Sequence, residues 1–195
     1  MKVSDVAIRR HLGHLTETIG IRLAGSAGER RAAGYIADCL RRAGAVVSTE
    51  TFPVRERAVK SESLRVRIGG RWRRIPCSLL SSTPGTDGRW VQKPLAFLDA
   101  QTGYQRADLG YLTGKAVLHF GSHIETADHY RRLMAAKPAF LMFADVRYPG
   151  TVVTADGMFP AYARDYGAVP TVSVAYLDAW DFMAAGAKAA GLRVS

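Results

Sequence analysis

The stretch KAVLHFGSHIETADHYRRLMAAKPAFLMFA, residues 115–144, decides the fold of this chain. It begins with a short apolar run that stops at Gly121, continues with apolar residues at helical spacing, and breaks at Pro138. The continuous apolar run 140–143 that follows is typical of a strand buried on both faces. A strand, a helix and a second strand with short connections predict parallel pairing through a right-handed crossover.

The residues after this unit continue the alternation. Residues 170–174, PTVSV, predict a third strand. A final helix with Asp178 as its N-cap is indicated by apolar residues at helical spacing, namely Trp180, Met183, Ala184 and Ala187.

The residues before this unit predict β structure. Leu64, Val66 and Ile68 alternate with arginines, and Gly69-Gly70 supplies a two-residue hairpin turn before residues 71–75. A further β-like piece covers residues 91–98.

The N-terminal part predicts two helices and a strand. The first helix places Ile8, Leu12, Leu15 and Ile19 on one face and ends at Gly20. The second begins at a capping box, in which Ser26 accepts a backbone N–H of the first turn and Glu29 reaches back to the N–H of Ser26. Its apolar stripe contains Ala32, Ala33, Ile36, Cys39 and Leu40, and Gly44 ends it. Residues 46–52, VVSTETF, predict a strand that ends near Pro53.

Composition excludes several classes of protein. The chain has 195 residues, of which 48% are hydrophobic, so it is neither disordered nor too short for a core. No apolar run approaches the roughly 20 residues of a membrane-spanning helix, and residues 1–5 show no secretory signal. Cys39 and Cys77 are interpreted as buried free thiols rather than a disulfide. A cytoplasmic protein is therefore expected.

The net charge of +10 is concentrated in one segment. Residues 55–74 contain eight basic and two acidic side chains, and Trp72 lies among them. Such a cluster could bind nucleic acid, with Trp72 as a stacking platform. Arginines that alternate with buried residues are also typical of a solvated strand face protected against aggregation, and we favour that interpretation.

The sequence contains no recognisable catalytic, cofactor-binding or metal-binding motif, so no residue is assigned to such a site. Residues 110–116, GYLTGKA, resemble a phosphate-binding loop, but the spacing is short by one residue and the loop precedes a strand. Neither cysteine has a histidine nearby in a recognisable signature. His119, His123, Asp128 and His129 lack the spacing of known zinc sites and are interpreted as ordinary surface or hydrogen-bonding residues.

Two segments nevertheless resemble a known family. Residues 21–30, IRLAGSAGER, followed by a helix, Gly44 and Val46-Val47, resemble the N-terminal segment of the di-zinc aminopeptidase and glutamate carboxypeptidase family (peptidase family M28). Residues 109–121 and 167–174, GAVPTVSV, are similar to elements of the protease-associated domain that these peptidases often carry.

The resemblance implies an α+β chain in two parts. Residues 1–54 would be an incomplete N-terminal helical segment with two helices and a strand, and residues 55–195 a hairpin-rich protease-associated domain with a small βαβ unit. Family members hydrolyse peptides with a pair of zinc ions, but no zinc ligand or catalytic Glu maps onto this chain, and Glu29 is structural. Without the catalytic sheet, the apolar faces of the two helices need another partner.

The expected function is therefore non-catalytic. The chain would shape substrate access in a zinc aminopeptidase-like protein or bind a partner, with zinc needed only by the catalytic domain. It would show no peptidase activity alone, and no contact with a membrane is expected. A stand-alone protein-interaction module, including a homo-oligomer, is the alternative, and a nucleic-acid binder that uses residues 55–74 is the third.

Overall fold

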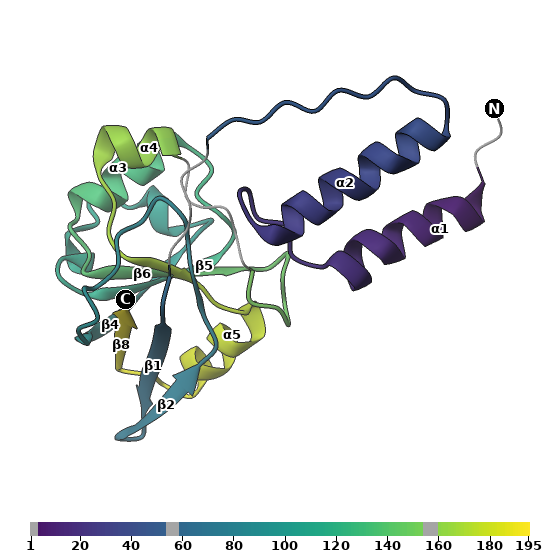
Figure 1. Ribbon diagram of the computed structural model, residues 1–195. Helices are drawn as coiled ribbons and strands as arrows, with labels where there is room; N and C mark the ends of the chain where they lie inside the picture. The colour runs from purple at the N-terminus through teal and green to yellow at the C-terminus, as the bar shows by residue number, and fades with distance from the viewer. Residues whose placement is uncertain (1–3, 54–58, 154–159) are drawn as a thin grey trace. The chain divides into compact units, whose positions relative to one another are not determined.

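The computed structural model describes residues 4–53, 59–153 and 160–195 and divides into two compact units, Met1–Ala58 and Val59–Ser195. The first unit is helical, and the second is built around one mixed sheet (Figure 1). Within the described residues, no helix has both the length and the apolar character needed to cross a membrane.

The helical unit contains α1 (Asp5–Gly13), its π-helical continuation η1 (His14–Ile19), and α2 (Ala27–Arg42). The side chain of Ser4 accepts a backbone N–H of the first turn of α1. The chain leaves η1 at Gly20, whose φ of 73° lies in the left-handed region that glycine adopts without strain. Both helices lie in the segments where the sequence predicts them.

The capping of α2 differs from the expected box in one bond. Ser26 Oγ accepts the N–H of Glu29 at 3.1 Å, as predicted. The Glu29 carboxylate, however, accepts the N–H of Gly25 instead of that of Ser26. The reason is that the N–H of Ser26 already donates to the carbonyl of Leu23 at 3.0 Å. The carboxylate therefore caps one residue earlier and fixes the loop that enters the helix.

The predicted strand at residues 46–52 is wrong. Residues 45–53 form no regular secondary structure. A strand is stable where its backbone N–H and C=O groups pair with a neighbouring strand, and no described strand pairs with this segment. Val46 is fully exposed and Phe52 is largely exposed. These side chains therefore do not pack on the face of a sheet, which is the environment that favours β-branched residues in strands.

The second unit contains one eight-stranded sheet with the order β2-β1-β8-β4-β5-β6-β7-β3. The strands are β1 (Glu62–Ile68), β2 (Arg71–Ile75), β3 (Ser78–Leu79), β4 (Val91–Asp99), β5 (Ala116–Gly121), β6 (Phe140–Asp145), β7 (Thr171–Ser173) and β8 (Ala189–Val194). Two short 3₁₀ turns, η2 (Gly103–Gln105) and η3 (Gly110–Leu112), lie between β4 and β5.

Strands β4, β5, β6 and β7 form the parallel part of the sheet. Leu133 of α3 (Ala127–Ala135) belongs to one core cluster and Phe182 of α5 (Tyr176–Ala184) to another. Consecutive residues of β6 alternate between these clusters, so β6 is buried on both faces, as its apolar run predicts. The βαβ unit expected from the sequence is confirmed; the further helix α4 (Pro160–Tyr166) was not expected.

Strands β1 and β2 form the expected antiparallel hairpin, with Gly69 and Gly70 at positive φ in its turn. Strand β8 was not predicted; it lies between β1 and β4 and is antiparallel to both. The final helix ends earlier than expected, at Ala184, so that Ala187 lies outside it. Asp178 lies in its first turn and is not the N-cap, because α5 begins one turn earlier, after Ala175.

Candidate functional site

Each helix of the helical unit exposes part of its apolar stripe. Ile8 and Leu12 of α1 and Ile36 and Leu40 of α2 each expose between 45% and 55% of their surface. No residue of α1 is buried. Because an amphipathic helix normally covers its apolar stripe with a neighbour, we call these four side chains the apolar helix face and treat them as a candidate docking surface.

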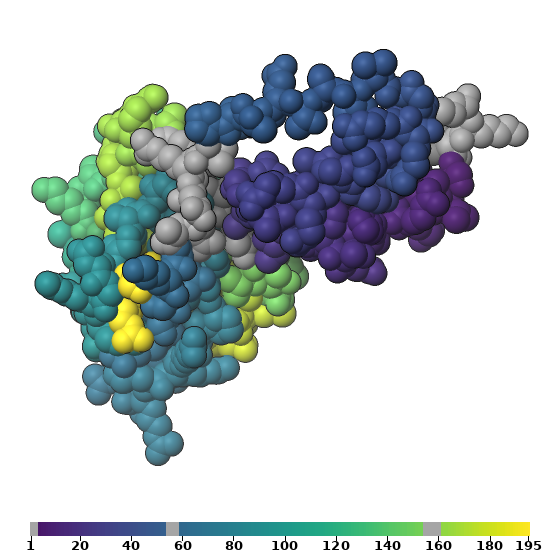
Figure 2. All heavy atoms as spheres, viewed as in Figure 1, coloured from purple at the N-terminus to yellow at the C-terminus, as the bar shows by residue number. Residues whose placement is uncertain are grey.

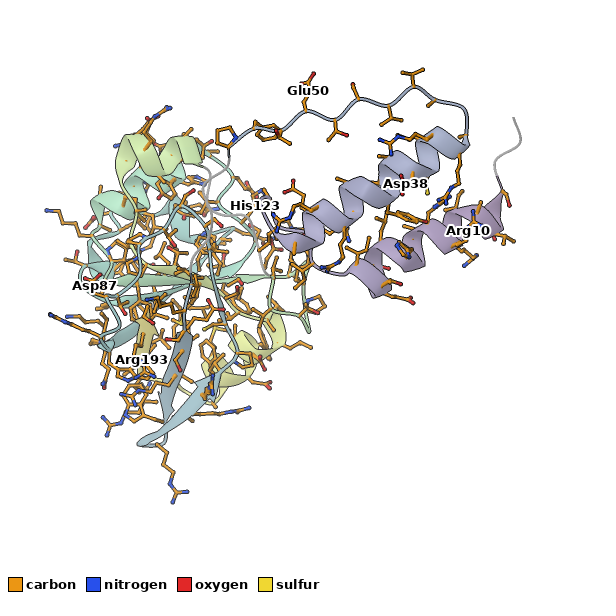
Figure 3. All side chains as sticks on the ribbon, in the orientation of Figure 1. Arg10, Asp38, Glu50, Asp87, His123 and Arg193 are labelled. Atoms are coloured by element: carbon orange, nitrogen blue, oxygen red, sulfur yellow. The ribbon has the colours of Figure 1, made fainter. Side chains whose placement is uncertain are left out.

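A pocket of about 670 Å³ lies in the same unit, and we call it the thiol pocket. It is lined by basic, aromatic and thiol side chains: Arg10, His11, His14, Tyr35, Cys39 and Arg42, together with Ala43. No carboxylate is among these lining residues. Figure 3 labels Arg10 on α1 and, nearby on α2, Asp38.

Hydrogen bonds and ring contacts connect the two helices across the thiol pocket. His11 Nδ1 lies 2.6 Å from Tyr35 Oη and 4.0 Å from Cys39 Sγ. Arg42 Nη2 donates to Cys39 Sγ at 3.3 Å. The ring centroids of His14 and Tyr35 are 4.0 Å apart. The Cys39 thiol therefore lies beside a guanidinium and an imidazole.

This arrangement shifts the pKa values of two side chains in the pocket. Desolvation raises the pKa of Tyr35, and the hydrogen bond and charge of Cys39 raise it further, whereas Arg10 and Arg42 lower it. The hydrogen bond that Arg42 donates to Cys39 is the largest cause that raises the pKa of Arg42. The phenol is thus neutral and the guanidinium charged at neutral pH.

No local sequence motif marks the thiol pocket. His11 and Cys39 are 28 residues apart, and only the packing of α1 against α2 brings them together. A signal was present in the sequence, because His11 and His14 are three residues apart and Tyr35 and Cys39 four, so that each pair shares a helical face.

Cys77 has a different environment from Cys39. Both cysteines are free, as expected, but each is half-buried rather than fully buried. Burial, with a smaller effect from the charge of Glu62, raises the pKa of Cys77 to about 12. Its thiol is therefore protonated at neutral pH and has an acidic neighbour, whereas Cys39 has a basic one.

The histidine cluster noted in the sequence is a packing and hydrogen-bonding feature. His119 of β5 is fully buried, and its Nε2 lies 3.1 Å from Tyr104 Oη. The ring of His129 stacks on Tyr104 at 4.1 Å. Burial lowers the pKa of His119 to about 4, so the imidazole is neutral. The hydrogen-bonding interpretation is confirmed for His119, although this residue lies in the core and not at the surface.

The zinc ions implied by the resemblance have no fitting site among the described residues. Asp128 forms an ion pair with Arg131 instead of facing His119. Across residues 4–53, 59–153 and 160–195, no group of three or more His, Cys, Asp or Glu residues is arranged to hold a metal ion.

The basic hairpin has its own internal order. The side chain of Arg65 lies between two tryptophans, with its guanidinium carbon 4.6 Å from the Trp72 ring and 4.0 Å from that of Trp90. Arg193 lies 5.1 Å from the Trp90 ring. A glycine at position 191 makes room for the Arg65 side chain, because a Cβ there would come within 3.4 Å of Arg65 Nε. The hairpin tip protrudes from the sheet unit (Figure 2), but part of the Trp72 ring is already covered by Arg65.

No known family model and no curated protein matches the chain. Solved structures do. BSAP, a zinc aminopeptidase from Bacillus subtilis, shares 21% identity with a TM-score of 0.68, over 95% of this chain and 42% of its own. A peptidase M28 precursor from Shewanella amazonensis SB2B shares 15% identity with a TM-score of 0.70, over 95% of this chain and 46% of its own.

An aminopeptidase from Aneurinibacillus sp. strain AM-1 is also similar, with 18% identity and a TM-score of 0.53, over 98% of this chain and 44% of its own. The likeness is one of fold. The chain spans less than half of the length of each of these three proteins. Its fold is therefore like that of one part of M28 aminopeptidases.

Proposed function

We propose that this chain is the non-catalytic N-terminal helical segment and protease-associated portion of an M28-type zinc aminopeptidase-like protein. The observation that carries the proposal is the coverage: 95% of the chain matches 42% to 46% of the length of two such peptidases. A fold shared at 15% to 21% identity does not carry activity with it, so the role is argued from the chain's own surfaces.

Two features support an accessory role. The apolar helix face is exposed on both helices, which suits a surface that a catalytic sheet would cover. The described residues offer no zinc site, so the metal and the hydrolysis would belong to the remainder of the protein. The chain would then limit which peptides reach the catalytic cleft, in a reducing cytoplasm where both thiols remain free.

The decisive experiment compares two products of the same gene. The 195-residue chain and the product of the full open reading frame are purified and assayed for zinc-dependent release of chromogenic amino acids. We expect activity from the longer product alone, and its loss on chelation. Zinc-dependent hydrolysis by the 195-residue chain, or a reading frame that stops at Ser195, would overturn the proposal.

A second test addresses the apolar helix face directly. In the 195-residue chain, amides of α1 and α2 should exchange with solvent at least about a hundredfold faster than those of β5 and β6, because little side-chain packing protects them. In the longer product they should become protected. A monomeric chain with strongly protected amides in α1 and α2 would show that the face needs no cover.

The stand-alone interaction module remains the second candidate, because the same apolar helix face would suit a protein partner or a second copy of the chain. It predicts a reading frame that stops at Ser195, no zinc uptake and, for self-association, a concentration-dependent sedimentation coefficient. Association should be abolished by Leu40→Asp and retained by Arg31→Asp, an exposed position on the same helix.

The nucleic-acid alternative predicts salt-sensitive binding of oligonucleotides that weakens when Arg71, Arg73 and Arg74 are neutralised. It is less well supported, because Arg65 already covers part of the Trp72 ring that would stack on a base.

A further inference from the structure

The thiol pocket carries positive charge that no carboxylate among its lining residues balances. Arg10 and Arg42 line it together with two histidines, and no carboxylate is among the lining residues. Asp38, whose charge acts on Arg42, forms an ion pair with Arg41 at 2.9 Å. A small anion that enters this pocket would find two guanidinium groups with free donors.

Cys39 supplies the thiol among the residues that line this pocket. Its sulfur accepts a hydrogen bond from Arg42 at 3.3 Å and lies 4.0 Å from His11 Nδ1. The thiolate is the form of a cysteine that attacks a disulfide, and the guanidinium of Arg42 contacts this sulfur directly. The thiol is half-buried, so it remains accessible to a molecule that occupies the pocket.

We infer that Cys39 is a modification site for small disulfides that carry carboxylates, with Arg10 and Arg42 guiding the anionic reagent to the sulfur. The Cys39 thiolate attacks one sulfur of the incoming disulfide, and a new S–S bond forms as the original one breaks. The second sulfur leaves as a thiolate and takes a proton from solvent, so the small disulfide is the oxidant. This inference does not depend on the proposed function.

Cys77 is the internal control for this inference. It is half-buried like Cys39, but burial raises its pKa to about 12, and the charge of Glu62 acts on it more strongly than that of Arg74. A protonated thiol beside a carboxylate is both a poor nucleophile and a poor partner for an anion. The two cysteines of one chain should therefore differ in rate and also in their preference for reagent charge.

The experiment uses two single-cysteine forms of the full chain, Cys77→Ser and Cys39→Ser. Each is reacted at pH 7 with the dianionic disulfide 5,5′-dithiobis(2-nitrobenzoate) and with the uncharged 4,4′-dithiodipyridine. Each rate is divided by that of N-acetylcysteine amide with the same reagent. For Cys39 we expect the anionic reagent to be favoured by roughly tenfold over the uncharged one, and the preference to fall with added salt. For Cys77 we expect slow reaction and no such preference.

The source of the preference is tested in the Cys77→Ser background. Arg42→Gln and Arg10→Gln should each reduce the preference by about threefold or more, whereas Arg42→Lys, which keeps the charge, should retain most of it. Helix content from circular dichroism shows whether each variant is folded. Equal normalised rates for the two reagents at Cys39, or a preference unchanged in folded Arg42→Gln, would overturn the inference. Mass spectrometry after incubation with oxidised glutathione should show one adduct, on Cys39.

Discussion

The two units of this chain are stabilised to different degrees. The sheet unit buries strands β5 and β6 on both faces, between α3 on one side and α5 on the other. The helical unit buries few side chains, and α1 buries none. Burial of apolar surface is the main driving force of folding. The sheet unit therefore has a large core to stabilise it, whereas the helical unit has little buried apolar surface.

The largest effect should come from the core of the sheet unit. Leu118 of β5 is fully buried, so Leu118→Ala should lower the free energy of unfolding by about 3–5 kcal/mol through lost contacts and a cavity. Leu40→Ala, at a half-exposed position of α2, should cost less than about 1 kcal/mol. Urea unfolding followed by tryptophan fluorescence measures the first effect directly, because all three tryptophans belong to the sheet unit. An equal loss of unfolding free energy in the two variants would contradict the difference in burial between the units.

The second effect depends on pH. The pKa of His119 is lowered to about 4 in the folded state, so the unfolded state binds the proton first as pH falls below about 6.5. The contribution of His119 to the free energy of unfolding is fully present above the pKa that the residue has in the unfolded state. It declines as pH falls toward the pKa of the folded state, by about 2.5 kcal/mol between pH 7 and pH 4.5. His119→Gln should remove that part of the pH dependence. If urea midpoints of the variant and the parent change equally with pH, His119 is not the group responsible.

Two glycines of α2 offer a matched pair within the helical unit. A Cβ at Gly28 would lie 2.2 Å from the carbonyl oxygen of Ile21, whereas one at Gly34 would have nothing within 4 Å. Gly28→Ala should therefore destabilise the helical unit by about 1–2 kcal/mol or more. Gly34→Ala should stabilise it by up to about 1 kcal/mol, because alanine favours a helix.

Hydrogen exchange of α1 and α2 amides measures both variants, and the tryptophan-monitored unfolding of the sheet unit serves as the control. That transition should be unchanged in both. A shift of it in Gly28→Ala would mean that the two units fold as one.

The smallest effect concerns the surface of the sheet unit. Arg65→Ala removes two cation–π contacts and should cost about 1 kcal/mol, whereas Arg67→Ala on the same strand has no such contacts among the described residues and should cost about half a kilocalorie or less. Trp72 and Trp90 would become more accessible to acrylamide quenching in the first variant alone. Equal quenching in both variants would show that Arg65 does not cover the rings in solution.

Most elements of the fold could be predicted because their signals are local. Three of these signals each lie within a few neighbouring residues: the apolar run 140–143, the Gly69-Gly70 turn and the N-cap at Ser26. Strand β8 could not be predicted in this way, since its sequence AAGLRV has weak strand propensity and follows the alanine-rich segment 184–188, AAGAK. It becomes a strand because β1 and β4 both pair with it.

The wrong strand prediction at residues 46–52 has the same cause as the failure to predict β8. Residues 46–52 have strong strand propensity but no partner, so propensity alone does not form a strand. The thiol pocket also depends on distant residues, because His11 and Cys39 meet only when two helices pack. Helical spacing could have shown which side chains share a face, but not which face meets which.

The position of β8 sets an order for folding on the ribosome. Among the described strands, the β1–β2 hairpin, although made early, pairs with none of the parallel strands and joins the sheet by way of β8. Until residues 189–194 have emerged, β1 and β4 both present unpaired edges. The growing chain must therefore keep two unpaired sheet edges apart from other chains until β8 pairs with both of them.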